Sequence, residues 1–179
     1  MSHEAGKRQL QVTALAGYPP EIGRCLWMLE DARRRTQEVV KGLGPLIIDW
    51  CATEHDNRIG TLLYHIAAIE LDWLYAEVLE QDFPADLVAL FPYDVRDPQG
   101  RLSVVTGVSL EEHLHRLATV RTALLTAFRE LSLEDFRRPR QLPDYAVTPE
   151  WVLHHLMQHE AGHRGEIGEM RRLAEQDIF

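Results

Sequence analysis

The chain has 179 residues, of which 45% are hydrophobic and 26% are charged, and its formal net charge is −9. These values predict one soluble globular domain, and the acidic balance excludes most nucleic-acid binders, which need clustered cations to hold phosphates. Cys25 and Cys51 form neither a metal-binding spacing nor a disulfide framework, and no apolar run reaches the ~18–20 residues of a membrane span. The N-terminus also lacks a signal-peptide core, so we expect a cytoplasmic protein.

Two long helices are predicted in the first half of the chain. Apolar residues recur at helical spacing over residues 20–43 and again over residues 57–80. Pro20 suits the opening turn of the first helix, and Gly42 and Gly44 follow its last periodic residues. Asp56 is the expected N-cap of the second helix.

Two further helices are predicted over residues 110–131 and 149–175. Ser109, with Glu112 three residues later, has the pattern of a capping box in front of the third helix. Thr148 is the expected N-cap of the fourth helix, because the proline that follows it suits the first helical position.

A long connection over residues 82–108 separates the second and third helices. It is rich in proline, so we expect at most a short helix or a hairpin within it. Four helices with one long crossover between helices two and three predict an all-α four-helix bundle in which those two helices run the same way. The whole chain is expected to form this single domain, with residues 1–17 flexible or loosely packed.

The fourth predicted helix carries the most informative side chains. At about 100° per residue, His159 and His163 lie on its apolar stripe, and His155 lies on the same side one turn earlier. Burying two imidazoles is costly unless something pairs with them, and a spacing of four residues brings both rings to one metal ion. From this helix alone, a metal site and a pair of structural core histidines remain equal alternatives.

A third ligand would have to come from another helix. His65 is the only histidine of the second predicted helix and flanks its apolar stripe. His113 and His115 open the third helix, where we expect surface positions. His55 falls in a loop and His3 in the N-terminal segment, so both are weaker candidates.

The string HEAGH (159–163) also matches the H-E-x-x-H pattern of zinc proteases. The longer form of that pattern requires glycine at 166 and histidine at 169, where this chain has Glu166 and Glu169. Only 16 residues follow His163, which leaves no room for a ligand from a later helix. We therefore reject a protease and expect Glu160 to flank or support the site.

Arginine clusters occur at residues 33–35 and 137–140. The first lies on a predicted helix and is expected to form a solvated face. The second lies in a predicted loop, where a surface position and a ligand-binding role are both open.

Glycine recurs every third residue at Gly162, Gly165 and Gly168 of the fourth predicted helix. Glycine inside a helix costs about 1 kcal/mol relative to alanine. We therefore expect these positions to allow the close approach of a neighbouring helix.

Two stretches resemble the DinB-like family of four-helix-bundle proteins, a family of DinB/YfiT-like metalloenzymes. They are IGTLLYHIAAIELDW (59–73) and TPEWVLHHLMQHEAGHRGEIGEMRRL (148–173), and the second contains the family hallmark of Trp151 followed by HxxxHRGxI. The likeness extends over the crossover segment FPYDVRDPQGRLS and the segment GVSLEEHLHRL, and so covers most of the chain.

The resemblance implies an up-down-down-up bundle, often a homodimer, with one divalent ion of zinc or nickel. The matching ligand positions are His65 in the second helix and His159 and His163 in the fourth. Glu166 stands where the family often has glutamine, and it could contact a metal-bound water or change the charge of the site.

Several relatives in the family are transferases or isomerases that use a low-molecular-weight thiol. The resemblance therefore implies a metal-dependent thiol S-transferase or a related detoxification enzyme acting on a small-molecule substrate. Residues 82–108 and the loop arginines Arg137, Arg138 and Arg140 would shape its pocket. Two alternatives remain: a hydrolase that uses metal-bound water with Glu166 or Glu160 as base, and a metal-stabilised stress-response bundle without catalysis.

Overall fold

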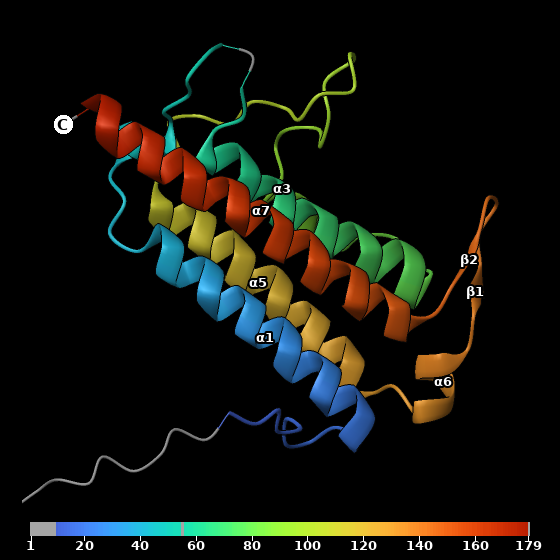
Figure 1. Ribbon diagram of the computed structural model, residues 1–179. Helices are drawn as coiled ribbons and strands as arrows, with labels where there is room; N and C mark the ends of the chain where they lie inside the picture. Colours follow the sequence, from blue (N-terminus) through green and yellow to red (C-terminus); the bar gives the residue numbers. More distant parts are fainter. Residues whose placement is uncertain (1–9, 55, 179) are drawn as a thin grey trace, which may run out of the picture.

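The computed structural model describes residues 10–54 and 56–178 of an all-α bundle (Figure 1). Its four long helices confirm the four predicted ones. Their bounds are α1 Pro20–Val40, α3 Ile59–Asp72, α5 Leu110–Arg129 and α7 Pro149–Ile178. The helical path of α3 continues into a π-helix, η1 (Trp73–Leu79). Within the described ranges, no helix is both long enough and apolar enough to cross a bilayer.

Side-chain caps start two of the long helices as predicted. Ser109 and Glu112 form the reciprocal capping box of α5, and the hydroxyl of Thr148 accepts a hydrogen bond of 3.1 Å from the Trp151 amide. The predicted cap of α3 is wrong, because the residue at the N-cap is Arg58, without a side-chain cap. Asp56 instead accepts a hydrogen bond of 2.9 Å from the amide of Thr53, a local turn that competes with capping.

The helices run in two parallel pairs. Helices α1 and α7 are parallel, because Arg33 contacts Glu160 and, further along both helices, Val39 contacts Arg171. In Figure 1 the colours of α3 and α5 both advance toward the end of the bundle that holds α6 (Leu133–Arg137), whereas those of α1 and α7 advance toward the C-terminus. As a result, α7 is antiparallel to α3, which it contacts through the histidines described below.

The connections between the long helices contain short helices and strands. Residues 82–108 hold both a short helix, α4 (Ala85–Val88), and a turn closed by a bridge between Arg96 and Leu102. Another short helix, α2 (Pro45–Ile48), lies between α1 and α3. Beyond α6, strands β1 (Arg140–Gln141) and β2 (Ala146–Val147) pair in antiparallel fashion and lead directly into α7.

Two large apolar clusters fill the bundle, one toward each end. The cluster nearer α6 includes Phe128 and Phe136, and the cluster nearer the C-terminus includes Leu62 and Ile167. On each of the four long helices, a buried polar residue lies between the two clusters in the sequence. These residues are Arg33, Glu70, Arg121 and Glu160, which together form a polar layer across the middle of the core.

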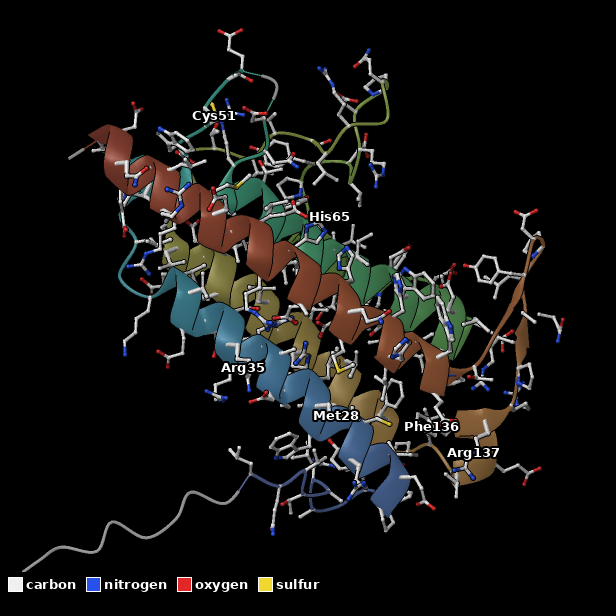
Figure 2. The ribbon with its side chains drawn as sticks, viewed as in Figure 1. Met28, Arg35, Cys51, His65, Phe136 and Arg137 are labelled. Atoms are coloured by element: carbon white, nitrogen blue, oxygen red, sulfur yellow. The ribbon has the colours of Figure 1, made fainter. Side chains whose placement is uncertain are left out.

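Arg33 corrects the prediction of a solvated arginine face. Its side chain is buried, whereas Arg34 and Arg35 lie on the surface and pair with Asp31. Burial of a guanidinium is tolerated here because two carboxylates of the polar layer lie within hydrogen-bond distance of it. Figure 2 shows Arg35 on the outer side of α1.

His113 also departs from its prediction, because it is only 1% exposed, whereas His115 is exposed as expected. The reason lies in the 82–108 connection, which folds back over the first turns of α3 and α5. The amide of Val105 donates a hydrogen bond of 3.1 Å to the hydroxyl of Thr61. The segment around Val105 and the first turn of α3 thereby enclose His113. His55 and His3 lie outside the described residues.

The glycine repeat of α7 does not receive a neighbouring helix. A Cβ atom built at Gly162, Gly165 or Gly168 would have no described atom of the chain within 4 Å apart from the helix's own backbone. The close approach in this bundle occurs instead at Gly60 on α3, where a Cβ would meet Nε2 of His113 at 3.0 Å and the carbonyl oxygen of Val105 at 3.3 Å.

We therefore expect opposite effects from two glycine-to-alanine changes. Gly60→Ala should lower the free energy of unfolding by about 1–3 kcal/mol, since an extra methyl overpacks a closed site. Gly162→Ala should raise it by about 0.5–1 kcal/mol, since alanine is the better helix former. Urea denaturation measures both values. Destabilisation by Gly162→Ala would contradict this and indicate that the face packs against a second copy.

Candidate metal centre

Three histidines meet between α3 and α7. Nε2 of His159 lies 3.1 Å from Nε2 of His65 and 3.1 Å from Nε2 of His163. One ligand atom from each ring lies within 4.8 Å of the other two, so the three rings could hold a metal ion. Figure 2 shows His65 on α3, partway along the bundle beside α7. The structure thus brings together the three residues that the sequence singled out.

Helix geometry accounts for this convergence. His159 and His163 are one turn apart on α7, so their side chains leave the same face of the helix. His65 reaches them from the antiparallel helix and is 5% exposed, while the two α7 rings are partly buried. The centre therefore has a closed side toward the core and a more open side along α7.

Hydrogen bonds cannot satisfy both of the Nε2···Nε2 contacts of His159 at the same time. A neutral imidazole nitrogen carries either one N–H or one lone pair, so Nε2 of His159 can form a hydrogen bond with only one of its two neighbours. Burial, followed by the nearby His163, lowers the pKa of His65 to about 4 and that of His159 to about 3. Both rings are therefore neutral near pH 7. A cation at the centre would use all three lone pairs at once.

The spacing also suits a transition metal. Around an ion bound at ~2.0–2.1 Å, two ligand nitrogens lie about 2.9 Å apart at a right angle and about 3.3 Å apart at the tetrahedral angle. The observed separations of 3.1 Å fall between these values. Among the described residues, the group consists of three imidazoles. Three such ligands leave coordination positions open, which is typical of catalytic rather than structural zinc sites.

The Nδ1 atoms of His163 and His65 face away from the centre, and they differ in their surroundings. Nδ1 of His163 lies 3.2 Å from Oε1 of Glu166, although the geometry is not that of a hydrogen bond. Nδ1 of His65 is buried without a partner in the described part of the chain. Metal-binding histidines usually donate this second N–H to a carboxylate or carbonyl. Glu166 thus lies beside Nδ1 of His163, although it does not accept a hydrogen bond from it here.

Glu160 is turned away from the histidines into the polar layer. Its Oε1 accepts a hydrogen bond of 2.8 Å from Arg33, and its Oε2 accepts one of 3.3 Å from Arg121. The same arginines donate to Glu70 at 2.7–2.8 Å. With both carboxylate oxygens engaged and only 1% of its surface exposed, Glu160 has no free oxygen to act as a general base.

The charges of the polar layer are balanced. Burial by itself raises the pKa of Glu70, but Arg121 and Arg33 outweigh this effect and hold the pKa below its ordinary value. Desolvation disfavours the charged form of Arg121, and the adjoining carboxylates more than offset this, so its pKa is raised. Two buried guanidiniums thus face two buried carboxylates, with Glu30 as a partly exposed third partner of Arg121.

An aromatic pocket of about 570 Å³ adjoins the centre along α7. Its rings come from three elements: Trp73 on η1, Tyr145 before β2, and Trp151 on α7. His155 stacks on Trp151 with centroids 5.2 Å apart and lies 5.9 Å from the ring of His159. His155 therefore stands between the pocket and the three histidines.

The sequence did not predict this pocket, although one signal for it was present. Trp151 and His155 are four residues apart on one helix, which places their rings on one face. Nothing in the sequence indicated that Trp73 and Tyr145 would join them. The π-helix matters here, because such segments often occur at functional sites, and Trp73 is its first residue.

The arginines of residues 137–140 are not brought to the histidines. Their prediction as loop residues is also wrong for two of them, because Arg137 is the last residue of α6 and Arg140 the first of β1. Arg140 is buried and donates to the backbone carbonyls of Asp135 and Arg138 at 2.7 and 2.8 Å. Arg138 is exposed and pairs with Asp135, and Arg137 is exposed at 3.7 Å from Glu150. Figure 2 shows Arg137 on α6 at the end of the bundle, away from His65.

Comparisons with known proteins agree with the fold. Residues 28–167 match the family described as the DinB superfamily. A solved structure titled as the conserved protein of locus from Enterococcus faecalis is similar, with a TM-score of 0.68 and 16% sequence identity. That likeness covers 85% of this chain and 95% of the other. A search of curated proteins finds no match.

Proposed function

The chain belongs to the DinB superfamily, and on that premise we propose that it is a metal-dependent thiol S-transferase. In this proposal His65, His159 and His163 hold one divalent ion, zinc or nickel. A low-molecular-weight thiol and a small-molecule electrophile are the substrates. The observation that carries the proposal is the convergence of the Nε2 atoms of three histidines beside an aromatic pocket.

Bound at this centre, the ion would lower the pKa of a coordinated thiol so that the thiolate forms near neutral pH. In the overall reaction the thiol loses its proton and its sulfur bonds to a carbon of the electrophile. The bond from that carbon to the leaving group breaks, and the leaving group takes the electron pair.

His155 is the residue best placed to take the thiol proton. Burial, and then the charge of His154, lowers the pKa of His155, so its ring is neutral at pH 7 and has a free lone pair. The ring lies between the histidine centre and the aromatic pocket, 4.2 Å from Trp73 between centroids. Glu166 would keep His163 in one orientation by holding its Nδ1 proton.

In this proposal the 82–108 connection contributes one charged side chain, Arg96, to the surroundings of the histidines. Arg96 is near enough to contribute to the lowered pKa of His65, after burial and His163. Among the described residues, its guanidinium donates to the carbonyl of Gly100 at 2.7 Å. A cation at the rim would favour the approach of a thiolate or another anionic substrate.

The test combines metal content with turnover. Untagged wild-type protein should contain about one equivalent of zinc or nickel by mass spectrometry, and His163→Ala should contain almost none. The wild-type protein should conjugate a chromogenic aryl halide only when a thiol such as bacillithiol, mycothiol or glutathione is present. His163→Ala should lose this activity.

Other outcomes would overturn the transferase proposal. Ester or amide hydrolysis that needs the metal but no thiol would identify a hydrolase, although Glu160 has no free oxygen to serve as its base. Metal that only raises the melting temperature, with no turnover of any electrophile tested, would identify a metal-stabilised binding protein.

A further inference from the structure

We propose that the pocket formed by Trp73, Tyr145 and Trp151 binds an organic cation, specifically a quaternary ammonium group of a small molecule. This inference does not depend on the metal or on the thiol reaction. It rests on three observations: the aromatic lining of the pocket, carboxylates beside it without a matching cation among the described residues, and a described lining that contains no cationic side chain.

The first observation is the geometry of the rings. Trp73 lies 5.4 Å from Trp151 and 6.5 Å from Tyr145 between centroids, with interplanar angles of 30° and 27°. The three rings thus present similarly oriented faces. Tyr145 and Trp151 are 45% and 47% exposed, so much of their surface is available to a ligand. The faces of tryptophan and tyrosine carry negative electrostatic potential, which attracts cations within about 6 Å.

The second observation is a buried carboxylate against this lining. Glu77 lies on η1 one turn beyond Trp73 and is 6% exposed. Its Oε1 accepts a hydrogen bond of 2.6 Å from the hydroxyl of Tyr145, and its Oε2 is buried without a partner in the described part of the chain. Burial raises the pKa of Glu77, the charge of Asp72 adds to this, and the hydrogen bond from Tyr145 only partly opposes it. A ligand cation in the pocket would compensate the charge of Glu77.

Further carboxylates lie near the hydroxyl of Tyr145 and affect its pKa. The hydrogen bond to Glu77 raises the pKa of Tyr145 to about 12, and the charges of Glu77, Asp72 and Asp144 add to the effect. Asp72 is half-buried and has no hydrogen-bond or ion-pair partner among the described residues. Several carboxylates therefore direct negative potential at the hydroxyl of a ring that lines the pocket.

The neighbouring arginines are engaged elsewhere. Arg140 donates to the carbonyl of Val78 at 3.2 Å and lies 3.8 Å from Glu80, and Arg137 lies 3.7 Å from Glu150. Neither lines the pocket. The field at the aromatic faces is therefore set by the carboxylates, which favours a cation over a neutral ligand of the same shape.

The pocket suits a methylated ammonium better than a bare metal ion. Its lining is mainly apolar, and its volume of about 570 Å³ falls within the range of small-molecule sites. A quaternary ammonium has no N–H to satisfy and is weakly hydrated, so it can leave water for the aromatic faces at low cost. A divalent ion would need several oxygen ligands, and Glu77 offers only one unpartnered oxygen.

The test compares choline with 3,3-dimethylbutan-1-ol, a neutral molecule of nearly the same shape. Both are titrated by calorimetry into full-length protein stripped of metal by a chelator. We expect choline to bind at least about tenfold more tightly than the neutral analogue. Trp151→Ala should weaken choline binding about tenfold, and Trp27→Ala, the same change of a tryptophan on α1, should leave it unchanged.

A second variant tests the carboxylate. Glu77→Gln can still accept the hydrogen bond of Tyr145 but removes the charge, so choline should bind several-fold more weakly while the neutral analogue is unaffected. Circular dichroism verifies that each variant is folded. Equal affinities for choline and its analogue, or undiminished binding in Trp151→Ala, would overturn the proposal. Binding that persists in metal-free protein separates this outcome from any failure of the metal centre.

Discussion

If the three histidines hold an ion as we propose, His159→Ala is expected to abolish metal binding and, with it, any stabilisation by added metal. His159 would be the central ligand, since its Nε2 lies 3.1 Å from the Nε2 atoms of both His65 and His163. Loss of a supporting partner around a metal already costs 10–100-fold in affinity. Loss of this ligand should therefore weaken binding by more than about 100-fold.

The measurement is the melting temperature with and without added zinc, together with metal content. At a zinc concentration of 100 times the dissociation constant, the wild-type protein gains about 2.7 kcal/mol. His159→Ala should gain almost nothing. His115→Ala, an exposed histidine of α5, is the matched control and should behave as the wild type does. Equal stabilisation of all three proteins by zinc would place the metal elsewhere.

The second large effect is expected in the polar layer. Glu70→Ala leaves Arg33 and Arg121 buried beside a single remaining buried carboxylate, because Glu70 accepts hydrogen bonds from both. Breaking a buried ion pair from one side costs about 3–5 kcal/mol. The expected result is a loss of that size in the free energy of unfolding, measured by urea denaturation at pH 7.

Asp31→Ala provides the control for this change. Asp31 pairs with Arg34 and Arg35 on the surface, where ion pairs contribute about 0–1 kcal/mol. The pKa of Glu70 is lower in the folded protein than its ordinary value of 4.5, so its contribution is complete above that pH and is lost as the pH falls below it. A loss in Glu70→Ala no larger than in Asp31→Ala would contradict the argument.

The periodicity of apolar residues along single helices was sufficient to predict the helical bundle and the helix face on which its histidines lie. A spacing of four residues puts His159 and His163 on one face whatever surrounds the helix, and the apolar stripe shows which face is buried. His65 followed as the histidine nearest the stripe of the second helix. These inferences succeed because regular helices convert sequence spacing directly into direction.

The same reasoning failed where burial depends on other segments. Arg33 reads as one of three solvated arginines, since its partners Glu70 and Glu160 lie on two other helices. His113 reads as a surface residue because nothing near it in the sequence shows that residues 82–108 return to cover it.

The sequence by itself determined the all-α class, the four long helices and the candidate ligands His65, His159 and His163. Only the tertiary structure decided that Glu160 belongs to the polar layer, that Arg140 binds backbone carbonyls, and that Trp73 and Tyr145 join Trp151 around one pocket. The physical reason is that local spacing sets where a side chain points on its own helix. The residues that it meets there are chosen by the lateral packing of helices and by the paths of the connections, which no local pattern encodes.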